Sequence, residues 1–133
     1  MGLGDVYKRQ VLLSVMGSPD DRQIDGVGGA NPLTSKVAIV QKSKRKGVDL
    51  DYLFIQVFVD EARTSTSQNC GNILAGVGPF AVENNLVNPT GPETTLTIYL
   101  ENSDSLADVT FLTPEGNVPV SYTHLTLPTI YSV

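Results

Sequence analysis

"NCGNILAGVGPFAVENN", residues 69–85, contains the only cysteine of the chain and is its main helix candidate. The segment carries almost no charge before Glu83, so a position on the surface would expose an apolar helix to water. Small residues in its interior would let strands approach it closely. Pro79 conflicts with a regular helix because it removes a backbone hydrogen bond, so we expect a bent helix. The stretch therefore predicts a central, buried helix.

The segments around this helix predict strands. In "DYLFIQVFVDE" (51–61), both alternate faces are largely apolar, which indicates either burial on both sides or a helix that covers one side. With 36–42 it would form a hairpin, closed by a basic loop. The other expected elements are a short helix over 11–19, stopped by Gly17 and Pro19, strands over 94–102 and 108–113, and the start of one more at 118–120. This order predicts an α+β domain in which a mostly antiparallel sheet curls around the central helix.

Composition excludes several classes of protein. The chain has 133 residues, about one domain, with 41% apolar and 17% charged residues, which is typical of a globular protein. Its net charge is −5, and four of its nine basic residues cluster at 42–46, which favours a solvated loop over a nucleic-acid interface. A lone cysteine excludes an internal disulfide and metal sites of the Cys/His type, and indicates the cytoplasm. The longest apolar stretch is too short to span a membrane.

The two ends have no clear pattern. Residues 1–10 and 121–133 resemble adapter-derived peptides that recur at the ends of unrelated genes from environmental sequencing. We therefore expect them to be non-native tails, with native sequence over 11–120, and we exclude His124, the only histidine, from catalysis. The alternative for the last segment is an ordinary C-terminal strand.

Cys70 would lie at the start of the central helix, where backbone N–H groups have no partner and the helix dipole is positive. A carboxylate fits that end, and Gly71 would leave the amides accessible. Asn69 would cap the helix, and Asn69 or Asn72 could donate hydrogen bonds to a ligand. The same field would stabilise a thiolate, so Cys70 could act as an acid or base. The alternative is a buried structural cysteine beside an ordinary asparagine cap.

Lys36 opens an apolar strand. It is either a solvated strand end or a desolvated amine that accepts a proton, with the hydroxyls of Thr34 and Ser35 available to a substrate carboxylate. The preceding loop "DGVGGAN" (25–31) does not match G-x-G-x-x-G, because Asn31 takes the place of the last glycine. We therefore expect a structural or active-site turn rather than a phosphate-binding loop.

Three blocks, in order and without large gaps over 11–120, are similar to the PrpF protein family. They are "MGSPDDRQIDGVGGANPLTSKVAIV" (16–40), "DYLFIQVFVDE" (51–61) and "NCGNILAGVGPFAVE" (69–83). The family includes 2-methylaconitate cis–trans isomerases, 4-oxalomesaconate tautomerases and methylitaconate isomerases. The resemblance implies a diaminopimelate-epimerase-like fold with two domains, each a sheet rolled around a helix, and an active site in the cleft between them. It also implies that the chain is one incomplete N-terminal domain, which lacks its second domain as a partner.

The resemblance assigns roles to individual residues. The acid/base lysine falls on Lys36 and the active-site cysteine on Cys70. Ser35, Gly71 and Asn72, with Asn69 beside them, would surround the carboxylates of the substrate, while Gln68 departs from the Gly or Pro of many members.

The implied reaction moves a proton and a double bond in an unsaturated di- or tricarboxylate without a metal or organic cofactor. The 133-residue chain alone would be inactive. The alternatives are an amino-acid epimerase or racemase of the same fold, and a non-catalytic binding domain.

Overall fold

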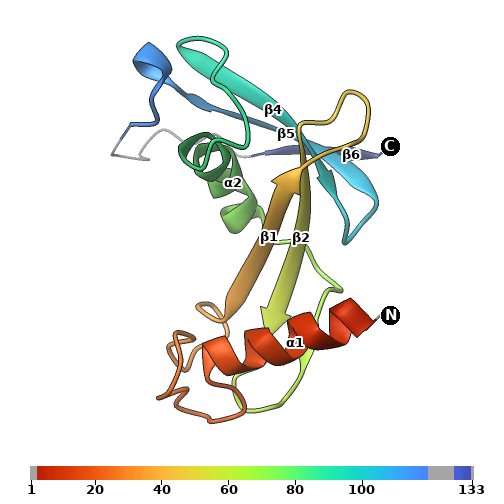
Figure 1. Cartoon of the computed structure of the whole chain (residues 1–133), viewed down its shortest axis with the longest axis vertical. Helices are drawn as coiled ribbons and strands as arrows, with labels where there is room; N and C mark the ends of the chain where they lie inside the picture. Colours follow the sequence, from red (N-terminus) through yellow and green to blue (C-terminus); the bar gives the residue numbers. More distant parts are fainter. Residues whose placement is uncertain (1–2, 120–127, 133) are drawn as a thin grey trace. The chain divides into compact units, whose positions relative to one another are not determined.

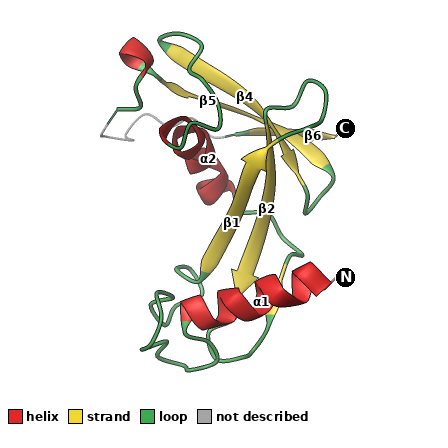
Figure 2. Ribbon diagram, viewed as in Figure 1, coloured by secondary structure: helices red, strands yellow, loops and turns green. Residues whose placement is uncertain are grey.

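A computed structural model describes residues 3–119 and 128–132, with side chains from Val6 onward; His124 lies outside the described residues. Within these residues there are two α-helices, six strands and one 3-10 turn (Figures 1 and 2). In chain order the elements are α1 (Leu3–Met16), β1 (Lys36–Lys42), β2 (Leu50–Val57), β3 (Thr64–Ser65), α2 (Gly71–Glu83), β4 (Glu93–Leu100), β5 (Ser105–Leu112), η1 (Pro114–Gly116) and β6 (Thr129–Ser132). The predicted order of the main elements is confirmed.

The strands are hydrogen-bonded in the order β1-β2-β4-β5-β6, with β3 beside β2. The β2–β3, β4–β5 and β5–β6 pairs are antiparallel, and β2–β4 is parallel. This mixed sheet with two helices is the predicted α+β class. The chain divides into two compact units, Met1–Ala38 with Phe54–Gln68 and Ile39–Leu53 with Asn69–Val133, so β1 and β2 each contribute to both.

In the second unit, α2 packs one face against β5 (Figure 1). Leu74, Val77 and Ala81 are buried on that face. A Cβ added to Gly78 would lie 2.4 Å from Cε1 of Phe111, so only glycine permits this approach of helix to strand. The helix continues through Pro79 and ends at Glu83, inside the predicted segment, with Asn84 as its C-cap.

The opposite face of α2 is exposed, which the low charge of the segment did not predict. Asn72 and Glu83 are exposed, and Phe80 is 47% accessible. A Cβ added to Gly76 would meet no atom within 4 Å. The reason is that glycine contributes almost no apolar surface, so a segment with little charge need not bury its whole circumference.

The first unit contains α1, the loop from Gly17 to Ser35, the start of β1, the end of β2, and β3. Helix α1 stops before Gly17, as predicted, but it begins at Leu3 rather than at residue 11. The added residues include "YKRQ" (7–10), and lysine, arginine and glutamine favour helix without an apolar stripe. Periodicity alone therefore missed them.

Three other boundaries differ from expectation. Strand β5 begins at Ser105, before the predicted start at residue 108, and the short strand β3 was not predicted. Residues 118–119 are not in a strand. Strand β6, antiparallel to β5, lies in the segment expected to be a tail, where a C-terminal strand was the alternative. No helix in residues 3–119 and 128–132 has the length and apolarity needed to cross a membrane.

Candidate active site

Lys36 is the first residue of β1 and is half-buried. Ser35, immediately before it, is completely buried. Its hydroxyl donates to the side-chain oxygen of Gln23 at 2.9 Å or to the carbonyl of Gly28 at 3.1 Å. Its carbonyl accepts hydrogen bonds from the backbone N–H of Val57 at 2.9 Å and from Nε2 of Gln56 at 3.1 Å. The backbone that leads into Lys36 is thus held on two sides.

The loop before Lys36 is held by hydrogen bonds within the first unit. This agrees with a structural turn, which is one of the two alternatives predicted for it. Gly28 makes room for Gln23, since a Cβ on Gly28 would lie 2.2 Å from the Gln23 side-chain oxygen. Thr34, a suggested carboxylate ligand, is exposed, and its hydroxyl bonds to the carbonyls of Gly28 and Asn31. The local sequence does not single out Gln23, because nothing in its neighbours marks it as buried.

The start of α2 differs from the prediction by one residue. Cys70, not Asn69, is the N-cap, and no side chain caps the helix. Cys70 is partly exposed, and Gly71 and Asn72 are exposed. A Cβ on Gly71 would meet no atom within 4 Å, so the amides of the first turn are sterically open. This geometry suits a carboxylate at the helix N-terminus.

Asn69 anchors the segment that leads into α2. Its Nδ2 donates to the hydroxyl of Ser103, 2.8 Å away in the turn between β4 and β5. Its Oδ1 is buried without a hydrogen-bond partner. The expected capping role was wrong because the helix begins one residue later than an Asn69 cap requires.

Tyr52 also holds the segment that leads into α2, through a hydrogen bond to the backbone of Cys70. Its side chain is completely buried, and its phenol donates to the carbonyl of Cys70 at 3.4 Å. Burial raises the pKa of the Tyr52 phenol, so this group stays a neutral donor. The sequence placed Tyr52 on a strand face but gave no sign of its contact with Cys70, eighteen residues further along the chain.

The predicted site residues therefore form two groups. Ser35 and Lys36 belong to the first unit, and Asn69, Cys70, Gly71 and Asn72 belong to the second. Within the described ranges, no three His, Cys, Asp or Glu side chains gather to hold a metal ion.

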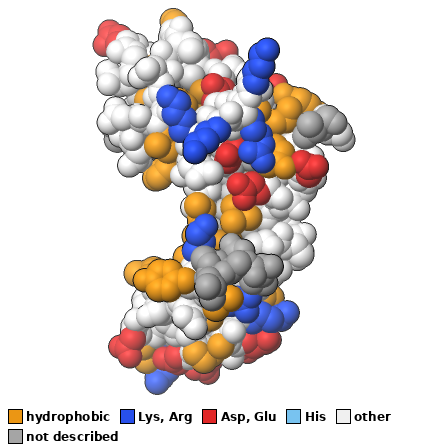
Figure 3. Space-filling view, turned by 45° about the vertical axis from the view of Figure 1, so that its right-hand side comes forward, with side chains coloured by type: hydrophobic (Ala, Val, Ile, Leu, Met, Phe, Trp, Pro, Cys, Tyr) orange, Lys and Arg blue, Asp and Glu red, His pale blue; other side chains and the backbone are white. Residues whose placement is uncertain are grey.

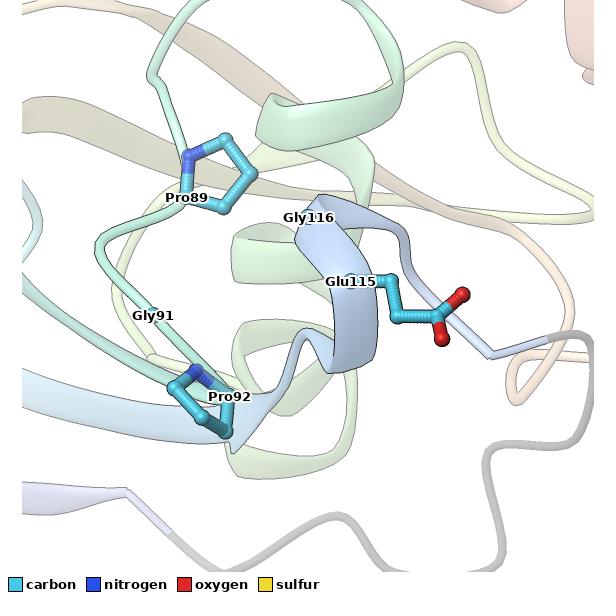
Figure 4. Close-up of a pocket in the computed structure, with 5 residues that line it drawn as sticks. All are labelled: Pro89, Gly91, Pro92, Glu115 and Gly116. Atoms are coloured by element: carbon cyan, nitrogen blue, oxygen red, sulfur yellow. The ribbon is translucent and has the colours of Figure 1, made fainter.

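Two of the cavities in the described part of the chain lie away from these residues. One, of about 470 Å³, is lined by Pro89, Gly91, Pro92, Glu115 and Gly116, and the Glu115 carboxylate points away from both prolines (Figure 4). The other, of about 220 Å³, lies in the first unit and is lined by residues of β2, by Phe58 just after it, and by the 65–68 segment. Neither contains a predicted catalytic residue.

The basic loop at 42–46 closes the β1–β2 hairpin, as predicted, and Lys and Arg side chains gather in this part of the surface (Figure 3). Its members are not all solvated. Arg45 stacks over the ring of Tyr99, 3.8 Å from the ring centre, and lies 3.6 Å from the carboxylate of Asp51. The Arg45 side chain therefore takes part in local packing and ion pairing.

The sequence is similar to those of known proteins. The model of the PrpF protein family matches residues 4–126. The chain is 58% identical over 127 residues to the (4E)-oxalomesaconate Delta-isomerase of Novosphingobium sp. (strain KA1), covering 89% of this chain and 36% of that protein. It is 59% identical over 109 residues to the 4-oxalomesaconate tautomerase of Pseudomonas putida, covering 82% and 30%.

A solved structure agrees with these relatives. The crystal structure of a methylitaconate-delta-isomerase matches with a TM-score of 0.84 and 40% identity, over 91% of this chain and 31% of that one. This bears out the diaminopimelate-epimerase-like α+β fold expected from the sequence. The chain spans about a third of the length of the curated relatives it matches. The chain belongs to the PrpF protein family.

Proposed function

We propose that the protein of which this sequence is a part is an isomerase that moves a proton and a double bond in an unsaturated di- or tricarboxylate. The observation that carries the proposal is the 58% identity, over 89% of this chain, to a protein named for oxalomesaconate isomerisation. We therefore take oxalomesaconate as the first candidate substrate, followed by methylitaconate and 2-methylaconitate.

In the proposed mechanism, Lys36 and Cys70 are the acid/base pair. The amine of Lys36 removes a proton from the carbon conjugated to the unsaturated acid, and the electron pair of that C–H bond spreads into the carboxylate. The thiol of Cys70 returns a proton at the other end of the conjugated system, which shifts the double bond. The open amides at Gly71 and Asn72 would stabilise the negative charge that develops on the carboxylate. Each step uses groups of the protein alone.

A chimeric enzyme tests this proposal. Here the chain replaces the matched segment of the Novosphingobium isomerase, and turnover of the three acids is followed by absorbance and NMR. We expect turnover of oxalomesaconate, and Lys36→Ala or Cys70→Ala should lower kcat by about 10²- to 10⁴-fold, the usual contribution of acid–base catalysis.

Lys42→Ala is the matched control, because Lys42 is an exposed lysine at the other end of β1 and should leave kcat unchanged. Near-normal turnover in the Lys36→Ala chimera would remove the central step of the mechanism. Conversion of amino acids instead of these acids would favour an epimerase.

A further inference from the structure

Gln23 is a buried polar residue with no role in the proposed chemistry. It is 2% exposed and has a positive φ of 44°, in the middle of the loop between α1 and β1. Its Nε2 donates to the hydroxyl of Ser18 at 3.0 Å, and its Oε1 accepts from the N–H of Ala30 at 2.8 Å and from the hydroxyl of Ser35 at 2.9 Å. Both ends of its amide are therefore satisfied inside the unit, which fixes its orientation.

Through these bonds Gln23 connects three segments. Ser18 follows α1, and its hydroxyl donates to the carbonyl of Phe58, just after β2, at 2.5 Å. Ser35 precedes Lys36, and its carbonyl is bonded to the N–H of Val57, the last residue of β2. The peptide that joins Ser35 to Lys36 is therefore fixed by β2 through its carbonyl and by Gln23 through the Ser35 hydroxyl.

We propose that Gln23 is a positioning residue, which sets the location of the Lys36 amine through its hydrogen bond to the buried hydroxyl of Ser35. The inference rests on the proposed function, in which Lys36 moves the proton. It assigns Ser35 a different task from the carboxylate contact that the resemblance implies, because a completely buried hydroxyl with internal acceptors at 2.9 and 3.1 Å is directed into the protein.

Two variants of the chimera separate these tasks. Gln23→Met keeps the length of the side chain and removes its three side-chain hydrogen bonds, to Ser18, Ala30 and Ser35. Ser35→Ala removes only the link to Lys36: the Gln23 oxygen keeps the N–H of Ala30, and the Gly28 carbonyl keeps the hydroxyl of Thr34. Ser35→Ala thus leaves no new buried donor or acceptor unpaired, and it remains informative if Gln23→Met folds poorly.

The control is Thr113→Val in the second unit. Thr113 is also completely buried. Its hydroxyl is hydrogen-bonded to the hydroxyl of Thr94, at 2.7 Å, and to the carbonyl of Gly91, at 2.6 Å. The substitution removes buried hydrogen bonds of a comparable kind without touching the residues that hold Lys36. It should lower the unfolding temperature and leave kcat per folded enzyme unchanged.

The expected result is a fall in kcat by about 10- to 100-fold in both Gln23→Met and Ser35→Ala with KM unchanged, since small displacements of a reacting group cost this much. The double variant should lose no more than Gln23→Met alone, because both substitutions remove the same link. Unchanged kcat in both variants overturns the proposal. A raised KM with normal kcat in Ser35→Ala also overturns it, in favour of a substrate contact.

The unsubstituted chimera and Lys36→Ala are assayed in parallel. If the unsubstituted chimera converts none of the three acids, the proposed function fails, and the Gln23 link is then judged by hydrogen exchange at the backbone N–H groups of Lys36 and Val57. Faster exchange there in Gln23→Met and Ser35→Ala, but not in Thr113→Val, supports the link. Unchanged exchange overturns it.

Discussion

Tyr52 shows how a single buried side chain can fix the backbone beside a proposed catalytic group. It is the largest completely buried side chain among the described residues, and its phenol reaches the carbonyl of Cys70. The carbonyl of Cys70 also accepts the backbone N–H of Leu74 at 3.0 Å, inside the first turn of α2. The phenol therefore links the start of α2 to β2. This link helps to fix the position of the Cys70 thiol.

The motifs identified the residues proposed for chemistry, but not the residues that support them. Lys36 and Cys70 stand out because an amine opens a strand and a thiol precedes a helix. Gln23, Tyr52 and Asn69 form their contacts with residues 12, 18 and 34 positions away, and such contacts leave no trace in local spacing. Only the folded backbone brings these partners together.

Replacing Tyr52 by phenylalanine removes the hydrogen bond from the phenol to the carbonyl of Cys70. The free energy of unfolding at pH 7 should fall by about 1 kcal/mol, the usual net value of one hydrogen bond. Because burial raises the pKa of the Tyr52 phenol, the direction in which stability changes at alkaline pH can be predicted. Below pH 10, the ordinary tyrosine pKa, the stability due to the neutral phenol is fully present. Above it the unfolded chain loses the proton first, so stability falls with rising pH.

Tyr52→Phe should therefore show a shallower loss of stability above pH 10, measured by urea unfolding from pH 7 to pH 11. Tyr7→Phe is the control, because Tyr7 is a 69% exposed residue of α1 and its phenol should make no difference. A Tyr52→Phe protein whose stability falls as steeply as that of the unsubstituted chain would contradict the role of burial.

At the scale of elements, α2 shows what a sequence pattern can and cannot specify. Low charge and small residues correctly predicted a helix packed closely against strands. Gly76 and Gly78 look equivalent in the sequence, yet one faces open space and the other faces the ring of Phe111. Which glycine is required depends on the rotation of the helix about its axis, and that is set by its partner β5.

Substituting each of these glycines by alanine should change stability in opposite directions. Gly76→Ala should raise the free energy of unfolding by about 0.5–1 kcal/mol, since alanine favours helix and the site is open. Gly78→Ala should lower it by about 1–3 kcal/mol, because its methyl group would overlap a ring that is only 2% exposed. Urea unfolding of the two variants measures both effects, and changes of the same sign would mean that α2 faces β5 differently.

At the scale of the whole molecule, fold class and element order were accessible from the sequence because strand and helix patterns differ in period and in charge. The starts of α1 and β5 were not, since propensity and strand pairing extend elements beyond their apolar pattern. For function, the share of the relatives' length that this chain spans matters more than these element boundaries. This sequence spans about a third of its curated relatives, and α2 keeps one face exposed, with Phe80 half accessible.

The 133-residue chain by itself should therefore show no turnover of oxalomesaconate, while the chimera does. Cys70 is partly exposed, and Gly71 and Asn72 are exposed, so water reaches the proposed carboxylate-binding end of α2 in this chain. Such an open end would hold a carboxylate weakly and would not keep solvent from the carbanion formed after proton removal. Adding the remaining part of the Novosphingobium isomerase as a separate polypeptide should restore part of the activity, and Lys36→Ala in this chain should abolish the restored part. Turnover by the isolated chain at a rate close to that of the chimera would mean that these residues alone form a working site, and that the rest of the relatives' length serves another purpose.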